Sequence, residues 1–310
     1  IRWPSGRICP HCGNNKSWAI QAAVNRPKRY ECSHCTRQFT VTTKTALHAT
    51  KLPLSIWLLA MYLITSSSKG LASTVLARLI GTTQPTAWKL GHTVRKMIDS
   101  SHSDAPLLKG VVELDETYVG GKPPIVAGVQ HKRGKGTSKQ WVLIAAERLG
   151  PVRAVPIESE KVETMQPFVD QYLCKSAHLM SDQHRSYIKI GKQFAEHSHV
   201  NHSRREYSRE DVHSNTTESF SSIFERARIG VFHYMSPKHL DLYLTELSFR
   251  WSNRDPKEGV TKMGKKKTTW KPKPIIEQLT SLLPFACGAQ LRWQRTGALR
   301  QIAFNSYWLN

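Results

Sequence analysis

The sequence has no long hydrophobic run. Its longest apolar stretch, residues 56–64, is interrupted by Tyr62 and is followed by Thr65 and three serines. A membrane-spanning helix needs roughly 18 predominantly apolar residues, so no membrane partner is expected. The sequence opens at Ile1 with no apolar signal region, and secretion is not expected either.

Acidic residues are also scarce. The 310 residues include 23 Asp plus Glu against 45 Lys plus Arg, for a formal net charge of +22. Such an excess is spread along the whole chain and favours a polyanionic partner, above all nucleic acid. The alternative is a protein that is merely basic. We expect a place in the cytoplasm or nucleoid of a bacterium, or in the nucleus of a eukaryote.

Cysteine is uncommon, with six in the whole chain. Four of them form two Cys-x-x-Cys turns, with 19 residues between the turns: Cys9, Cys12, Cys32 and Cys35. This spacing is typical of a zinc ribbon, in which four thiolates hold one structural Zn²⁺. Two disulfides are the alternative, and they require an oxidising compartment. We expect a zinc-ribbon domain over residues 1–45.

Residues 50–100 have the pattern of a helical domain. Apolar residues recur at helical spacing, and Gly81 and Pro85 suit the end of one helix and the first turn of the next. Two helices joined by a short glycine-containing turn predict a helix-turn-helix DNA-binding domain, with a plain helical hairpin as the alternative. The candidate DNA contacts on its second helix are Gln84, Thr86, Lys89 and His92.

A new domain begins near residue 108. Residues 111–119 predict a strand, and alternation along it puts Glu113 and Asp115 on one face and Glu116 on the other. A carboxylate in the middle of an apolar strand is costly unless it binds a cation or another partner. Asp115 is therefore a candidate catalytic residue. Glu113 could be the ligand instead, although the rim of the site is the more natural place for it, and Glu116 should point away, toward a basic partner.

The elements that follow predict an α+β fold. Strands near 140–147 and 152–157 are followed by a helix, a short strand ending at Asp182, a helix, a strand near 194–201 and a helix containing Glu218. This order is that of the RNase H-like fold, a mixed five-stranded sheet with flanking helices. In it Asp115, Asp182 and Glu218 would meet at one edge of the sheet. Three convergent acids repel one another unless cations neutralise them, which suits a two-metal phosphoryl-transfer site with Mg²⁺ or Mn²⁺.

Several short motifs are specific to one family. They are Leu114–Lys122 (Leu-Asp-Glu-Thr-Tyr-Val-Gly-Gly-Lys), Ser181-Asp182, His213–Phe220, Met235–Leu240 and Phe249–Arg254. With the cysteine turns and the helical region, the chain resembles the DDE transposases of the zinc-ribbon bacterial insertion-sequence group, which are related to the eukaryotic Merlin transposases. The resemblance covers about residues 7–254.

The resemblance implies a DNA transposase that binds the terminal inverted repeats of a mobile element and catalyses metal-dependent strand cleavage and strand transfer. The implied partners are double-stranded DNA, both element ends and target, and further copies of the chain, as a homodimer or higher oligomer. Both Asn215 and Glu218 match the family's third position, and a carboxylate offsets metal charge better than an amide. A domesticated DNA-binding regulator without catalysis and an RNase H-like nuclease are the alternatives.

Basic residues outside the acid site are further candidates for DNA contact. Lys122 and Arg185 follow the first two catalytic acids in sequence. We expect the catalytic domain to occupy residues 108–254. Residues 255–310 predict a basic C-terminal tail, whose lysine- and proline-rich first part would be disordered without DNA.

Overall fold

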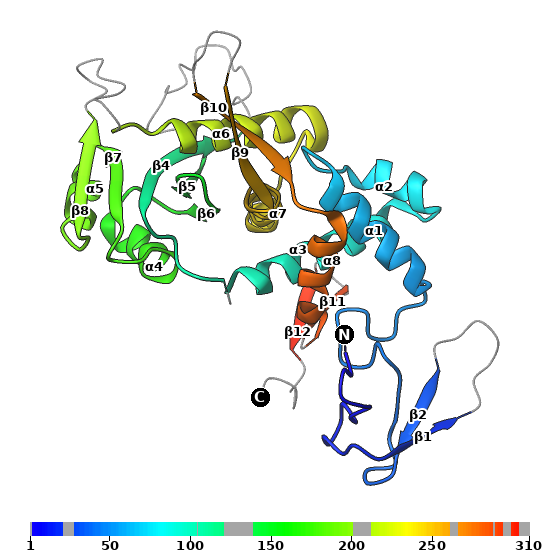
Figure 1. Cartoon of the computed structure of the whole chain (residues 1–310). Coiled ribbons are helices and arrows are strands. Elements are labelled where there is room, and N and C mark those ends of the chain that lie inside the picture. Colours follow the sequence, from blue (N-terminus) through cyan, green and yellow to red (C-terminus); the bar gives the residue numbers. More distant parts are fainter. Residues whose placement is uncertain are drawn as a thin grey trace. The chain divides into compact units, whose positions relative to one another are not determined.

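The computed structural model describes residues 2–20, 28–103, 105–120, 139–200, 212–260, 266–287, 289–293 and 299–303 (Figure 1). The chain forms two compact units, each of which is discontinuous in sequence. One consists of residues 1–67, 71–103 and 274–310, and the other of residues 68–70 and 104–273. No helix in the described part of the chain is long and apolar enough to cross a membrane.

The second unit is built on a mixed five-stranded sheet. Its strands lie in the order β6 (Val152–Ile157), β5 (Gln140–Glu147), β4 (Val111–Val119), β7 (His178–Asp182) and β8 (Glu196–Val200). The first three strands are antiparallel neighbours, and β7 and β8 run parallel to β4. With the helices described below, this topology confirms the RNase H-like fold.

The register of the sheet brings the first two acids to the same level. In the parallel pairing of β4 with β7, Glu113 stands opposite Met180. Asp115 and Asp182 are each two residues further along their strands, so both point to the same face of the pleated sheet. β7 ends at Asp182.

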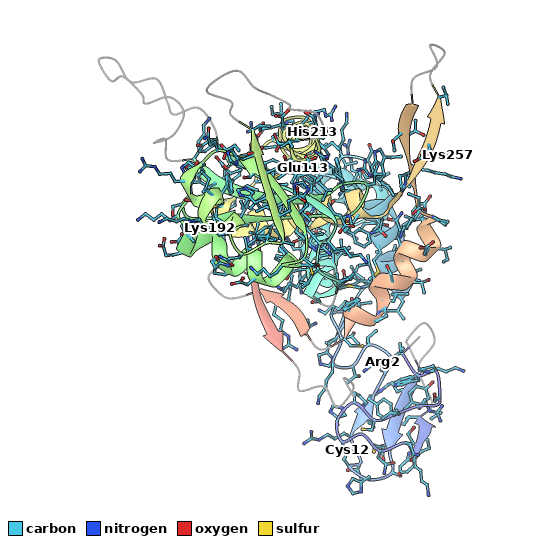
Figure 2. The ribbon with its side chains drawn as sticks, turned by 60° about the vertical axis from the view of Figure 1, so that its left-hand side comes forward. Arg2, Cys12, Glu113, Lys192, His213 and Lys257 are labelled. Carbon is cyan, nitrogen blue, oxygen red and sulfur yellow. The ribbon has the colours of Figure 1, made fainter. Side chains whose placement is uncertain are left out.

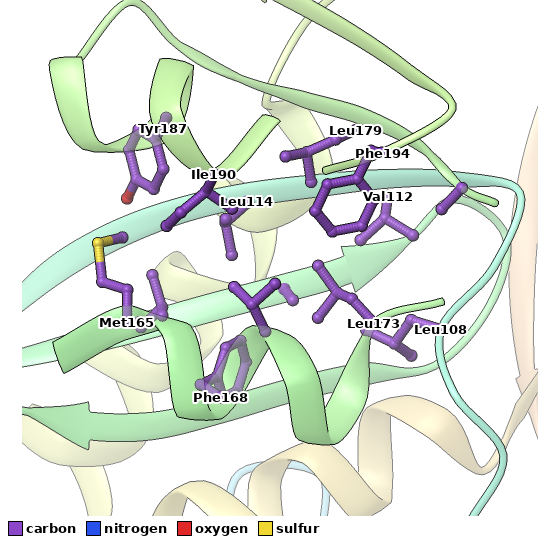
Figure 3. Packing of buried hydrophobic residues seen from close by; sticks show 14 of the residues in the cluster. Leu108, Val112, Leu114, Met165, Phe168, Leu173, Leu179, Tyr187, Ile190 and Phe194 are labelled. Atoms are coloured by element: carbon purple, nitrogen blue, oxygen red, sulfur yellow. The ribbon is translucent and has the colours of Figure 1, made fainter. Parts of the chain in front are cut away.

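Two short helices cover one face of the sheet. Helices α4 (Val162–Tyr172) and α5 (Arg185–Gly191) contribute Met165, Phe168, Tyr187 and Ile190 to a buried cluster. In Figure 3 these side chains converge on Leu114 and Val112 of the central strand. The side chains of Val112 and Leu114, which point away from Asp115, thus hold α4 and α5 against this face by burying apolar surface.

Two longer helices cover the other face. Helix α6 (Asn215–Ala227) contacts β4 and β5 and contributes Phe220 and Phe224 to a second buried cluster, and α7 (Leu240–Ser252) contacts β6 and adds Tyr243, Leu244, Leu247 and Trp251. A π-helical turn, η2 (Arg228–Phe232), and a 3₁₀ turn, η3 (Pro237–His239), connect α6 to α7. The predicted helix around Glu218 is confirmed, with Phe220 and Phe224 on its buried side, although Ser214 at its amino terminus makes no side-chain capping hydrogen bond.

The segment after α7 differs from the predicted tail. Strands β9 (Arg254–Val260) and β10 (Lys266–Pro272) pair as an antiparallel hairpin, which belongs to the second unit. The two threonines and the tryptophan of β10 favour a strand more than the lysine and proline content suggested. From residue 274 on, the chain belongs to the first unit.

The first unit contains the four cysteines of the predicted zinc ribbon and the helices of the predicted helix-turn-helix. Strands β1 (Ser17–Ile20), β2 (Arg29–Cys32) and β3 (Gln38–Phe39) form a small antiparallel sheet. Helices α1 (Leu54–Ser66), α2 (Ser73–Ile80) and α3 (Gln84–Ser103) follow. Gly81 ends α2 at a φ of 65°, a left-handed conformation that favours glycine, so α2 and α3 meet at the short turn that the sequence predicted.

The end of the chain packs against these helices. Helix α8 (Ile275–Leu282) contacts α1 and α3, and the 3₁₀ turn η4 (Leu283–Ala286) contacts α3. Strands β11 (Ala289–Trp293) and β12 (Leu299–Ala303) form a second hairpin. The amide of Ala46 donates a hydrogen bond of 2.6 Å to the carbonyl oxygen of Ala286, so residues far apart in sequence share this unit.

Candidate functional site

The three predicted acids occupy the places that the fold predicts for them. Asp115 lies in the centre of β4, Asp182 at the end of β7 and Glu218 in the first turn of α6. Asp182 Oδ1 accepts a 2.8 Å hydrogen bond from the amide of His184, which orients this carboxylate at the start of α5. Asp115 Oδ1 accepts one of 2.9 Å from the amide of Glu116.

The electrostatics of Asp115 reflect its acidic neighbours. Burial, with a smaller contribution from the negative charges of Asp182, Glu218 and Glu113, raises the pKa of Asp115 to about 7. A carboxyl group with such neighbours is stabilised in its ionised form by a nearby cation. Carboxylate oxygens are the ligands that Mg²⁺ and Mn²⁺ prefer, so the chemistry of these residues fits such an ion.

The carboxylate oxygens of the three acids lie farther apart than the sulfurs of the four cysteines do. Within the described residues, one group of three or more Cys, His, Asp or Glu side chains has ligand atoms that all lie within 4.8 Å of one another. That group is Cys9, Cys12, Cys32 and Cys35. The acids are therefore neighbours that interact through their charges, with oxygens farther apart than in a closed metal site.

Glu113 has a role that the sequence did not reveal. Its side chain is completely buried rather than at the rim of the site. Glu113 Oε2 accepts hydrogen bonds from the amides of Thr216 (2.7 Å) and Thr217 (3.3 Å), in the first turn of α6. A carboxylate is stabilised at a helix amino terminus, where amides lack partners within the helix. Glu113 thus ties β4, which carries Asp115, to the helix that carries Glu218.

Two further side chains complete this tie. Arg148 Nε donates a 2.8 Å bond to Glu113 Oε1, and the hydroxyl of Thr216 donates one of 2.9 Å to the same oxygen. Arg148 also reaches His213, whose Nδ1 lies 3.3 Å from Glu113 Oε1. Figure 2 shows His213 beside Glu113 at the edge of the domain. The spacing of two residues between Glu113 and Asp115 was the available signal, since it puts both on one face of the strand.

Glu116 points to the opposite face, as the alternation along the strand predicted. It accepts a hydrogen bond from the hydroxyl of Tyr187. Burial, together with a hydrogen bond to the carboxyl group of Glu160, raises the pKa of Glu116 to about 8. Its described contacts are thus a buried tyrosine and a second acid, and the basic partner stays a prediction.

The four cysteines form the second candidate site. The Sγ atoms of Cys9 and Cys35 are 3.7 Å apart, and those of Cys12 and Cys32 are 3.5 Å apart. The amide of His11 points to Cys9 Sγ and that of His34 to Cys32 Sγ, each at 3.4 Å. Four sulfurs with backbone N–H support suit a tetrahedral Zn²⁺. The two turns therefore fit the structural zinc that their spacing predicted.

Two family models match the chain. Residues 1–38 match the transposase zinc-ribbon domain, and residues 107–252 match the ISXO2-like transposase domain of the IS1595 group. Together the two matches cover more than half of the sequence. The chain is a zinc-ribbon DNA transposase of the IS1595 group. The matches take in both the cysteine cluster and the three acids, so the expected family is confirmed.

Known proteins similar to the transposase agree with this assignment. An uncharacterized protein in the transposable element ISH50 of Halobacterium salinarum is 27% identical over 239 residues, which is 73% of this chain and 79% of the relative. Among solved structures, the Mos1 strand transfer complex is similar to 64% of this chain and 76% of its own, at 10% identity and a TM-score of 0.24. The Mos1 paired end complex with Mn has a TM-score of 0.21 at 12% identity. At these scores the structural likeness carries no weight beside the family matches.

The candidate DNA contacts of the helical region have different environments. Gln84 is exposed at the start of α3, and Thr86 and Lys89 are partly exposed. His92 is completely buried, and its ring contacts that of Trp88 with 4.1 Å between the centroids. Residues 90–95 of α3 are all buried, so the helix is enclosed on every side at His92. The structure thus corrects His92 from a DNA contact to a core residue of the transposase.

The remaining candidates lie in the catalytic unit. Arg185 is exposed in the first turn of α5, three residues after Asp182. Asn215 is exposed at the first position of α6, and its amide donates a 3.4 Å bond to His213 Nδ1. Lys122 lies outside the described residues.

Proposed function

We propose that the transposase cleaves and joins DNA strands at Asp115, Asp182 and Glu218. The observation that carries the proposal is the placement of the acids: Asp115 and Asp182 lie at the same level of adjacent parallel strands, and Glu218 lies in the first turn of the helix that Glu113 ties to β4. Three acids with this arrangement, on an RNase H-like sheet in a transposase, are best explained by a site for two Mg²⁺ or Mn²⁺ ions. When bound, such ions activate the attacking oxygen and stabilise the leaving oxygen of an in-line displacement.

Each residue of the site would either bind a metal ion or orient a group that does. Asp115 and Asp182, at the same level of adjacent strands, would bind from the sheet, while Glu218 would bind from α6. We assign the third ligand to Glu218 because its carboxylate offsets metal charge better than the amide of Asn215 does. Asn215, three residues earlier on the same helix, would orient a ligand or a DNA group. Glu113 would act as a positioning residue, because it fixes the amino terminus of the helix that carries Glu218.

DNA would be recognised by the transposase outside the acid site. Gln84, Thr86 and Lys89 at the amino-terminal end of α3 would contact the terminal inverted repeats, with Arg185 against the backbone near the acids. The formal charge of +22 supports binding to both the element ends and the target. Two ends must be brought together for transposition, so a homodimer or a larger homo-oligomer would form on DNA.

The first experiment compares the wild type with Asp115→Asn on labelled duplexes that carry the ends of its own element, with Mg²⁺. We expect cleavage and joining by the wild type, and a loss of at least about 10³-fold in the variant, since metal ligation is worth several kcal/mol in the transition state. Asp170→Asn is the matched control, because Asp170 is an exposed acid paired with Lys175 at 2.8 Å.

Each other outcome has a defined meaning. Cleavage without joining would indicate an RNase H-like nuclease. Specific binding of the ends without metal-dependent chemistry would indicate a domesticated DNA-binding regulator. Equal activity of Asp115→Asn and the wild type would overturn the assignment of the site.

A further inference from the structure

A groove in the catalytic unit begins at Glu218 and ends at the β9–β10 hairpin. Its volume is about 810 Å³. Its walls come from α6, from the end of α7 and from the hairpin, and they include Arg148, Glu218, Arg226, Trp251, Arg254 and Trp270. Three of these side chains are arginines and one is an acid. The groove therefore joins a predicted catalytic residue to a basic wall.

Arg254 is held in this wall in an unusual way. Its guanidinium lies over the ring of Trp251 at 4.0 Å from the centroid and over that of Trp270 at 4.7 Å. Its Nε donates a 3.0 Å hydrogen bond to the carbonyl oxygen of Trp251. Two ring contacts and one hydrogen bond fix the plane of the guanidinium.

One end of this guanidinium has no partner within the described part of the chain. Arg254 Nη2 is buried and donates no hydrogen bond to a described group. Burial also lowers the pKa of Arg254. Arg148 and Arg228, by contrast, are each paired with a glutamate, at 2.8 Å and 2.7 Å. Arg254 as a whole is half-buried, but a guanidinium whose Nη2 is buried without an acceptor is costly, so the fold is best explained if an anion binds there.

The neighbouring groups favour a phosphate. Thr268, Ser219 and Ser222 line the same groove and can donate hydroxyl hydrogen bonds, and Arg226 adds an exposed positive charge. A planar guanidinium with free N–H groups matches two oxygens of a phosphodiester. The ring faces of the two tryptophans that meet Arg254 are already covered, so a backbone phosphate fits this place better than a stacked base.

We propose that Arg254, held between Trp251 and Trp270, binds a backbone phosphate of the DNA strand that runs from the acid site along this groove. This inference rests on the proposed function, since it takes the ligand to be the DNA on which the acids act. It adds a binding site at Arg254, the last residue of the predicted catalytic domain, supported by Trp270 from the segment that the sequence predicted to be a tail.

The test uses the full-length protein and duplexes that carry one end of its own element. A single charge-neutral methylphosphonate replaces each phosphate in turn around the cleaved bond. For the wild type we expect about a tenfold loss of affinity at one or two positions, the size of a charge-assisted contact. Arg254→Gln should bind unmodified DNA about tenfold more weakly and show no further loss at those positions.

Two further variants make the result specific. Arg228→Gln, which removes an arginine already paired with Glu225, should keep the wild-type profile. Trp270→Ala, which removes one ring over Arg254 on the exposed hairpin, should weaken sensitivity at the same positions. The slope of log affinity against log salt should fall by about one for Arg254→Gln, because one phosphate contact is lost.

The outcomes separate this inference from the proposed function. If the wild type cleaves DNA while Arg254→Gln, folded by its melting curve, retains the wild-type affinity and profile, the phosphate site is wrong and the catalytic assignment stands. If the predicted profile is seen but no variant or wild type cleaves, the phosphate site stands without the chemistry. If Arg254→Gln does not fold, a wild-type profile in Trp270→Ala would overturn the proposal.

Discussion

The zinc ribbon and the catalytic domain of the transposase bury very different amounts of apolar surface. In the ribbon, the buried cluster consists of Cys9, Cys32 and Phe39, with the rings of Trp3 and Tyr30 packed against it. In the catalytic domain, two clusters fill both faces of a five-stranded sheet. Two of the three buried residues in the ribbon are themselves predicted zinc ligands.

This difference in packing indicates different roles for the zinc of the ribbon and for the ions at the acids. Phe39 contacts Trp3 and Tyr30 with ring centroids 6.0 and 5.7 Å apart, which is too little packing for a stable domain. Binding of structural zinc is worth about 10 kcal/mol or more in small ribbons and fingers. We therefore expect zinc to hold the ribbon together, and the ions at the acids to supply chemistry to a domain that folds without them.

The largest expected effect is the loss of the ribbon on removal of zinc. A zinc-selective chelator, or Cys12→Ser, should remove hydrogen-exchange protection from the amides of β2, such as that of Cys32, which bonds to the carbonyl oxygen of Arg37 at 3.2 Å. The amides of β4 should keep their protection, because the packing of the sheet does not depend on zinc.

Cys174→Ser is the control for this experiment, because Cys174 is outside the cysteine cluster and contacts Ser176. It should leave both parts protected. Protection of β2 that survives chelation would contradict the metal-held ribbon.

A smaller effect is expected when a core side chain of the catalytic domain is truncated. Leu114 is completely buried in β4, under α4 and α5. Leu114→Ala should lower the free energy of unfolding of this domain by about 3 kcal/mol, through lost burial and the cavity that remains. Urea unfolding followed by the exchange of the β4 amides measures it.

The matched control is Leu107→Ala, since Leu107 is 43% exposed. Its loss should be below about 0.5 kcal/mol. The loss in Leu114→Ala should be the same with and without the chelator. If the loss of stability in Leu114→Ala were larger after chelation, the stability of the catalytic domain would depend on the zinc ribbon.

Much of this organisation could be predicted from local sequence. The cysteine turns have a spacing that few other structures require, and alternation in residues 111–119 distinguishes Asp115 from Glu116. The placement of Asp182 and Glu218 followed from the order of strands and helices, because the topology fixes which strand ends and which helix meet. The family matches confirmed the transposase, and the roles of the acids remain predictions.

What the sequence did not reveal depends on contacts between distant residues. Glu113 and Thr216 are 103 positions apart, and only the packed fold brings the helix terminus to the strand. His92 has a helical position that could face DNA or the core, and burial decided it. Trp270 was assigned to a tail because lysine and proline around it concealed a strand, and the pairing of that strand with the one that begins at Arg254 was not foreseen.

The smallest effect on stability is expected for a substitution of Glu113. This carboxylate connects β4 to α6 in the catalytic domain without a metal, unlike the cysteines of the zinc ribbon. Glu113→Gln keeps an acceptor for the amides of Thr216 and Thr217 but loses the charge opposite Arg148. We expect a loss of about 2 kcal/mol in the free energy of unfolding, the size of a hydrogen bond to a charged group.

This substitution should also weaken the binding of Mn²⁺ in a calorimetric titration, since the helix that carries Glu218 is held less firmly. Glu196→Gln is the control, because Glu196 is an exposed acid in β8, and it should change neither quantity. If Glu113→Gln unfolds like the wild type, the tie contributes no stability. If it is destabilised but binds Mn²⁺ normally, Glu113 supports the fold without positioning the third acid.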